Sequence, residues 1–248
     1  LVAPGTYNEF LNINKDDLII RSTGGASVTT VNIQVRTSGQ GGVVGGVVFY
    51  NSGITLDGFT IQDSTVQSGE IKIIRIGNAP ADSNNNTLTN CVIKGNIDTP
   101  TNKTDYGILV YGSDNTISGN EICNVGYTGI NVVGGPWSDG QGNTISNNSF
   151  HDIGIAGSLS YGITIDRSGN NKLNIEGNTF SNFLGGDKSW AMVVWGQMAE
   201  GTHISGHNIS GIYNGISLAS ARGVYVTGNN ISVPGTAIRL FYSSWAGP

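Results

Sequence analysis

The side chains of this sequence that could do chemistry are a few aromatic, acidic and basic residues set at regular positions among apolar ones. Tyr111, Asp166 and Trp195 each end a short apolar segment, and Arg167 follows Asp166 directly. Aromatic rings stack on the apolar faces of pyranose rings, while carboxylate and guanidinium groups bind hydroxyl and carboxylate groups. If the segments lie side by side, these residues share one face and form a ligand-binding surface.

Other residues extend this predicted surface. Three loops rich in Gly, Trp and charged residues, 134–142, 151–154 and 185–190, flank the segments that carry Asp166 and Trp195. Such insertions form a binding rim in many proteins, but loops also drift without function, and aromatic residues favour strand surfaces in general. Both interpretations stay open. The predicted substrate-binding residues are Tyr111, Trp195, Arg75, Asp187 and Trp137, and the predicted catalytic residues are Asp166 and Arg167.

Hydrolysis of a glycosidic bond would require two carboxyl groups about 5 to 9 Å apart. Asp166 paired with Asp187 or Asp152 provides the candidates. His151 and Asp152 also form a possible acid–base pair, although a surface His beside an Asp is more often incidental. Neighbouring outward positions of the long strands show no cluster of Asp residues, so the sequence predicts no metal site, and it identifies no cofactor.

The segments that must position these side chains form a repeat. They start on a common apolar position, followed by alternating inward and outward residues. A spacing of 22 residues is one coil of a solenoid, and longer spacings are coils with an inserted loop. The leading apolar residues are Ile108, Ile130, Ile163, Met192, Ile216 and Ile238, spaced 22, 33, 29, 24 and 22 residues apart.

A second motif of the Gly-Asn-x-Ile type recurs once per coil. Its Gly or Asn supplies the left-handed backbone conformation of a corner. The residue directly after this Gly or Asn falls at the same place in every coil. We therefore expect these residues to form a column in which each side-chain amide bonds to the following coil. The members of this column are Asn120, Asn148, Asn178 and Asn229, with His207 as a structural hydrogen-bonding replacement and Cys91 and Phe59 below them.

With residues 2–7 and 11–20 as a first coil, the sequence resembles the right-handed parallel β-helix superfamily, which includes NosD-like (CASH) domains and β-helix polysaccharide lyases and epimerases. The resemblance covers essentially the whole chain. It implies an all-β, single-stranded right-handed parallel β-helix of about nine to ten coils, with one domain over residues 1–248 that is either the whole protein or part of a longer chain. Lyases of this superfamily use clustered acidic residues with Ca²⁺, or a Lys/Arg pair, to neutralise a uronate. An outward Asp cluster and the epimerase Asp-Pro-His-Asp run are both missing, which argues against both classes.

The composition of the chain indicates which classes of partner and which cellular location to expect. The net charge of −5 and isoelectric point near 5.0 argue against nucleic acid. The sequence contains no run of about 20 apolar residues, so we expect no transmembrane segment. With only 12% charged residues and 38 glycines, the chain is typical of exported proteins, so we expect an extracellular or cell-surface location. Cys91 and Cys123 fall in different columns of adjacent coils, which predicts two free thiols.

Two functions follow from these observations. The first is a carbohydrate-binding or polysaccharide-processing protein that uses the face of Tyr111, Asp166 and Trp195, with a polysaccharide or cell-surface glycan as partner. The alternative is a structural surface, sheath or filament subunit that forms a homo-oligomer or polymer through coil ends or flat faces. The chain enters the repeat without an evident N-terminal cap, which favours the second.

Overall fold

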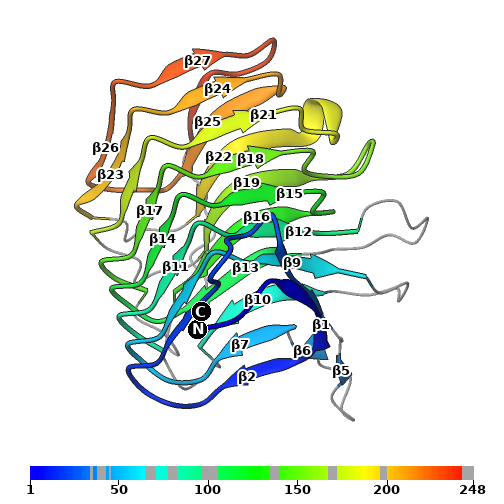
Figure 1. Cartoon of the computed structure of the whole chain (residues 1–248). Coiled ribbons are helices and arrows are strands. Elements are labelled where there is room, and N and C mark those ends of the chain that lie inside the picture. Colours follow the sequence, from blue (N-terminus) through cyan, green and yellow to red (C-terminus); the bar gives the residue numbers. More distant parts are fainter. Residues whose placement is uncertain are drawn as a thin grey trace.

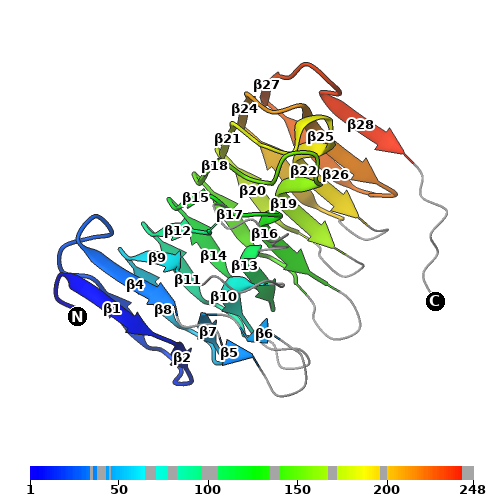
Figure 2. The same cartoon turned by 90° about the vertical axis from the view of Figure 1, so that its right-hand side faces the viewer.

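Each sequence repeat folds into one coil of three short strands, and successive coils stack in parallel (Figure 1). The computed structural model describes residues 1–33, 36–37, 43–44, 46–64, 71–77, 83–96, 106–134, 140–166, 172–195 and 200–241. Strands in the same position of successive coils pair with each other and form three parallel sheets. Figure 2 shows the coils advancing along one axis from β1 to β28.

The first sheet holds the long strands of the repeat. Its strands are β2 (Leu11–Ile13), β7 (Val47–Phe49), β10 (Lys72–Ile76), β13 (Tyr106–Tyr111), β16 (Thr128–Val133), β19 (Ser160–Asp166), β22 (Ser189–Trp195), β25 (Asn214–Ala219) and β28 (Ile238–Phe241). Nine strands at about 4.8 Å per step make a rod of about 40 Å.

The second and third sheets complete each coil. The second sheet contains β3 (Ile19–Arg21), β8 (Thr55–Asp57), β11 (Thr87–Thr89), β14 (Thr116–Ser118), β17 (Thr144–Ser146), β20 (Asn174–Glu176), β23 (Thr202–Ser205) and β26 (Val224–Thr227). The third sheet contains β1 (Gly5–Glu9), β4 (Thr29–Ile33), β9 (Thr60–Asp63), β12 (Val92–Lys94), β15 (Glu121–Cys123), β18 (Ser149–His151), β21 (Thr179–Ser181), β24 (Asn208–Ser210) and β27 (Asn230–Ser232). Outside these sheets, β5 (Arg36–Thr37) pairs with β6 (Val43–Val44), and Gly186–Lys188 form a 3₁₀ turn, η1.

The core runs along the inside of the coils as one apolar cluster. Alternate residues of every strand point inward because side chains along a strand point to opposite faces. Phe150 and Phe180 of successive coils stack with ring centroids 4.8 Å apart. No coil could bury its apolar side alone, so the stack is stabilised mainly by contacts between neighbours.

The corner between the second and third sheets carries the predicted column of left-handed residues. Its members have φ between 54° and 82°, a region that Gly and Asn tolerate best. They are Gly58, Asn90, Gly119, Asn147, Gly177, Gly206 and Gly228.

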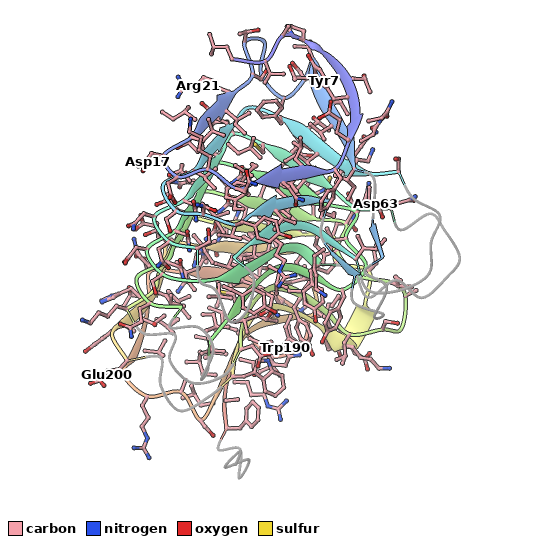
Figure 3. The ribbon with its side chains drawn as sticks, turned by 90° about the horizontal axis from the view of Figure 1, so that it is seen from below. Tyr7, Asp17, Arg21, Asp63, Trp190 and Glu200 are labelled. Carbon is pink, nitrogen blue, oxygen red and sulfur yellow. The ribbon has the colours of Figure 1, made fainter. Side chains whose placement is uncertain are left out.

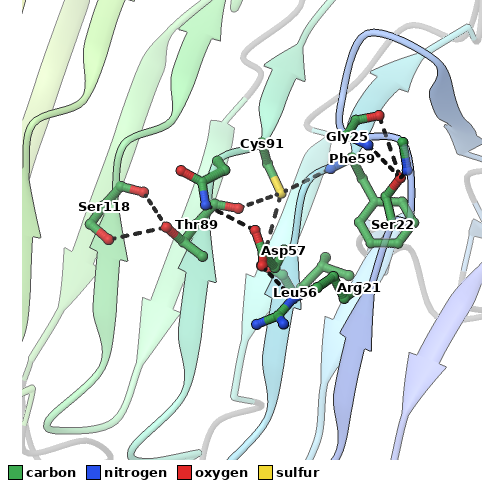
Figure 4. Close-up of polar contacts among 11 residues, drawn as sticks. Arg21, Ser22, Gly25, Leu56, Asp57, Phe59, Thr89, Cys91 and Ser118 are labelled. Atoms are coloured by element: carbon green, nitrogen blue, oxygen red, sulfur yellow. Dashed lines mark hydrogen bonds and ion pairs between the residues drawn. The ribbon is translucent and has the colours of Figure 1, made fainter. Parts of the chain in front are cut away.

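The predicted ladder beside this corner is confirmed. The Oδ1 atoms of Asn148 and Asn178 each accept hydrogen bonds from the backbone N–H and side-chain amide of the preceding ladder residue, at 2.9 to 3.0 Å. His207 takes the same place, and its Nδ1 accepts the Asn178 N–H at 2.9 Å. Below, Cys91 Sγ accepts the Phe59 N–H at 3.5 Å, as Figure 4 shows.

A second ladder, which the sequence analysis did not identify, lies at the corner between the first and second sheets. The Ile54 N–H donates to Asn86, the Asn86 N–H to Asn115, and the Asn115 N–H to Asn143, at 2.8 to 2.9 Å. All three Asn residues are buried. Two columns of amides therefore fix the register of the coils on either side of the second sheet.

The predicted fold class is confirmed: the chain is a single-stranded parallel solenoid with about the expected number of coils. Cys91 and Cys123 are both free, as predicted, and both are buried. Among the described residues, no helix has the length and apolar character needed to cross a membrane.

Candidate functional site

The outer face of the first sheet carries two columns of outward-pointing residues, one of which contains Tyr111, Asp166 and Trp195. Tyr111 pairs with Val133 and Val133 with Asp166, while Trp195 pairs with Ala219 and Ala219 with Phe241. Since Ile165 pairs with Val194, Asp166 and Trp195 are the next residues along adjacent strands. We call Tyr111, Asp166 and Trp195 the outer column, and its alignment is as predicted.

The adjacent outward column offers little surface. Arg75 pairs with Leu109 in this column, and most of the other members are nearly inaccessible to solvent. The buried members are Leu109, Asn131, Thr164, Val193 and Ser217. Alternation along a strand fixes the side on which a residue lies, but not what packs over it. The outer column is therefore the part of this face that a ligand can reach.

Arg75 and Tyr111 contact each other. The guanidinium carbon of Arg75 lies 5.4 Å from the centroid of the Tyr111 ring, within the range of a cation–π interaction. Both side chains are half-buried. Trp195, by contrast, is 42% exposed at the end of β22, which is unusual for so large an apolar side chain.

Asp187 does not join the outer column. It lies in η1, before Ser189, and Ser189 pairs with Ser160 at the start of β19. Asp166 lies at the other end of β19, so the two carboxylates are about 20 Å apart along the strand direction. Asp152 also precedes β19. The considered pairing of Asp166 with Asp187 or Asp152 is wrong, because each partner lies at the opposite end of the long strands.

Two of the three predicted loops, residues 151–154 and 185–190, lie at the start of the long strands. The third loop begins with Gly134, directly after the end of β16 and so at the opposite end of the long strands. Residues 135–139 of this loop lie outside the described residues. Trp190, labelled in Figure 3, lies near the start of β22. Three tyrosines also lie at the start of the long strands, where the Tyr127 ring packs edge to face against Tyr106 and Tyr161, each with ring centroids 5.5 Å apart. Trp137 and Arg167 lie outside the described residues, so their roles stay predictions.

Comparison with known families agrees with this architecture. Residues 81–187 match the family model described as a right handed beta helix region. The chain is a right-handed β-helix. The same three sheets continue on both sides of the matched segment. No curated protein matches the sequence.

A second polar group of the β-helix lies on the outer face of the third sheet. Cys123 of β15 pairs with His151 of β18, and Glu121 points to the same side of β15 as Cys123. Of these residues, only His151 was predicted from the sequence to belong to a polar pair, with Asp152. Aligning the corner motifs of the two coils would have placed Cys123 beside His151, since each residue directly follows the aromatic or aliphatic residue that ends the motif.

The Cys123 thiol is not an activated nucleophile in this setting. Burial, together with the nearby Glu121 carboxylate, raises its pKa to about 12. A thiol with such a pKa is protonated at neutral pH, whereas catalytic cysteines have lowered pKa values. Cys123, His151 and Asp152 therefore do not act as a nucleophilic triad by themselves.

Proposed function

We propose that the outer column of the β-helix binds carbohydrate, with an extracellular polysaccharide or a cell-surface glycan as ligand. The observation that carries the proposal is the alignment of a 42% exposed Trp195 with Asp166 and Tyr111 along the rod axis. Aromatic faces with adjacent polar groups suit sugar rings, which have an apolar face and a hydroxyl edge.

The spacing of the outer column suits an extended chain better than a single sugar. Tyr111 and Trp195 lie three coils apart, about 14 Å along the axis, with Asp166 between them. A polymer lying along the axis would contact all three side chains. The cation–π contact of Arg75 holds the Tyr111 ring in place from the neighbouring strand.

Binding is better supported than cleavage. The carboxylates predicted as partners of Asp166 lie at the far ends of the strands, so among the described residues the site lacks the pair that hydrolysis needs. The low charge and the Gly-rich composition support a location outside the cell, where such ligands occur.

The proposal is tested by measuring the binding of the purified chain to a panel of neutral and acidic polysaccharides. Trp195→Ala and Asp166→Asn should each weaken binding at least about tenfold, because hot-spot aromatic and hydrogen-bonding groups contribute 1.4 kcal/mol or more. Tyr225→Ala is the matched control, since Tyr225 is 56% exposed on the second sheet.

The proposal is wrong if no polysaccharide binds to the chain, or if all three variants bind polysaccharide with the same affinity. Sedimentation of these samples measures self-association. Ordered polymers without any response to glycan would favour the structural alternative instead.

A further inference from the structure

The outer face of the third sheet brings a thiol, an imidazole and a carboxylate together. The ligand atoms of Glu121, Cys123 and His151 all lie within 4.8 Å of one another. The three residues come from two adjacent strands, β15 and β18, whose parallel pairing fixes their backbones. Among the residues that the structure describes, no other group of His, Cys, Asp and Glu side chains meets this condition.

The His151 ring is held so that one nitrogen faces this group. Its Nε2 lies 3.2 Å from Glu121 Oε1, and its Nδ1 lies 2.7 Å from Asp152 Oδ2. Asp152 is itself fixed at a corner, where its backbone has φ of 54° and its Oδ1 accepts a hydrogen bond from the Asn182 side chain. An imidazole whose second nitrogen bonds a carboxylate is the usual arrangement of a metal-binding histidine.

The three donors suit a borderline-soft divalent ion. Thiolate, imidazole and carboxylate are the ligands that Zn²⁺ takes in proteins, at about 2.0 to 2.3 Å, which places neighbouring ligand atoms about 3.5 Å apart. The Glu121–His151 separation already fits this value. The remaining adjustment falls to the Glu121 side chain, which is 47% exposed and not packed in the core.

We propose that Glu121, Cys123 and His151 bind one Zn²⁺-like ion, with Asp152 as the positioning residue for the imidazole. Three protein ligands leave a fourth coordination position, which faces solvent on the Glu121 and His151 side. When bound, such an ion would act as a Lewis acid toward water or an oxygen ligand. The site lies on a different sheet from the outer column, so it does not depend on glycan binding.

The test uses metal-free protein and two probes, Co²⁺ and Zn²⁺. Co²⁺ should produce a near-ultraviolet thiolate-to-metal band that saturates at one ion per chain, and Zn²⁺ should abolish it by displacement. Cys123→Ser should remove the band. His151→Gln and Asp152→Asn should each weaken Zn²⁺ binding by about tenfold or more, as loss of a ligand or its positioning group does.

Matched controls come from the second sheet, which carries His203 and Glu176, and from the buried ladder, which contains Cys91. Cys91→Ser, His203→Gln and Glu176→Gln change the same residue types outside the group and should leave the affinity unchanged. Circular dichroism and thermal melting check that each variant folds. A wild-type protein that shows no thiolate band at Co²⁺ saturation would overturn the proposal without reliance on any variant, and so would an equal Zn²⁺ affinity in folded Cys123→Ser.

Discussion

A single buried side chain, His207, couples the stability of the ladder to pH. Its Nδ1 accepts the backbone N–H of Asn178, which only the neutral imidazole can do. Burial lowers its pKa to about 4, while the same side chain in the unfolded chain has a pKa near 6.5. When the pH lies between these values, the His207 imidazole is therefore protonated in the unfolded chain and neutral in the folded chain.

We expect the free energy of unfolding to decrease as the pH falls from about 6.5 to about 4, and to be unaffected by His207 above this window. The pKa difference of about 2.5 corresponds to about 3 kcal/mol. His207→Asn should remove this dependence, because Asn keeps the acceptor and its amide can donate to the Ile175 carbonyl, as Asn178 donates to Ile145. Urea unfolding at several pH values measures both proteins. If the free energy of unfolding of the variant falls with pH as steeply as that of the wild-type protein, the acid sensitivity comes from groups other than His207.

Among the strands, those of the first sheet depend on a column of small residues where successive coils approach closely. A Cβ added at Gly129 would lie 2.7 Å from the Gly162 carbonyl oxygen and 2.7 Å from the Phe150 ring. Gly162 stands in the same relation to Ala191 and Phe180. The bulk of the stacked phenylalanines on the third sheet is thus accommodated by glycine on the first.

We expect Gly129→Ala to destabilise the protein by about 2 to 3 kcal/mol, because neither the carbonyl nor the ring can move without disturbing the next coil. Gly157→Ala serves as the comparison. Gly157 has a φ of 76° but open space around it, so its substitution should cost only about 1 kcal/mol of backbone strain. Thermal or urea unfolding compares the two. A smaller loss for Gly129→Ala than for Gly157→Ala would contradict a packing role.

The strand columns were predictable from the sequence, whereas the surroundings of those columns were not. Slipping one strand by a residue would turn its apolar side outward, so Tyr111, Asp166 and Trp195 could be aligned without a structure. The burial of Leu109 could not be predicted, since periodicity does not show what covers an outward residue. The position of Asp187 depends on where a loop meets its strand, which repeat spacing leaves open. The metal-ligand group required the direction of the His151 ring as well as its column.

The whole molecule is a stack in which each coil is stabilised by the coils on both sides. The last described strands have only one such neighbour, and their side chains are exposed, with Leu240 at 73% and Tyr225 at 56%. In a nearest-neighbour stack, opening is easiest where one interface is lacking.

We therefore expect backbone amides of β16, β19 and β22 to exchange with solvent most slowly, and those of β1 and β26–β28 most rapidly. Hydrogen exchange followed by mass spectrometry of the 248-residue chain resolves these segments. Equal protection along the rod would show that the coils open only all together, and that the stack is more cooperative than contacts between neighbours alone require.

The ladder at the corner between the second and third sheets also affects how such a molecule can change over evolutionary time. Amide oxygens, an imidazole nitrogen and a thiol sulfur occupy successive rungs of this ladder, because each rung requires only an atom that accepts one N–H. A duplicated coil would bring its own acceptor and its own donor, and would fit between any two existing coils. The length of the rod is therefore free to vary by whole repeats, and a surface formed along it can lengthen or shorten without redesign of the interior.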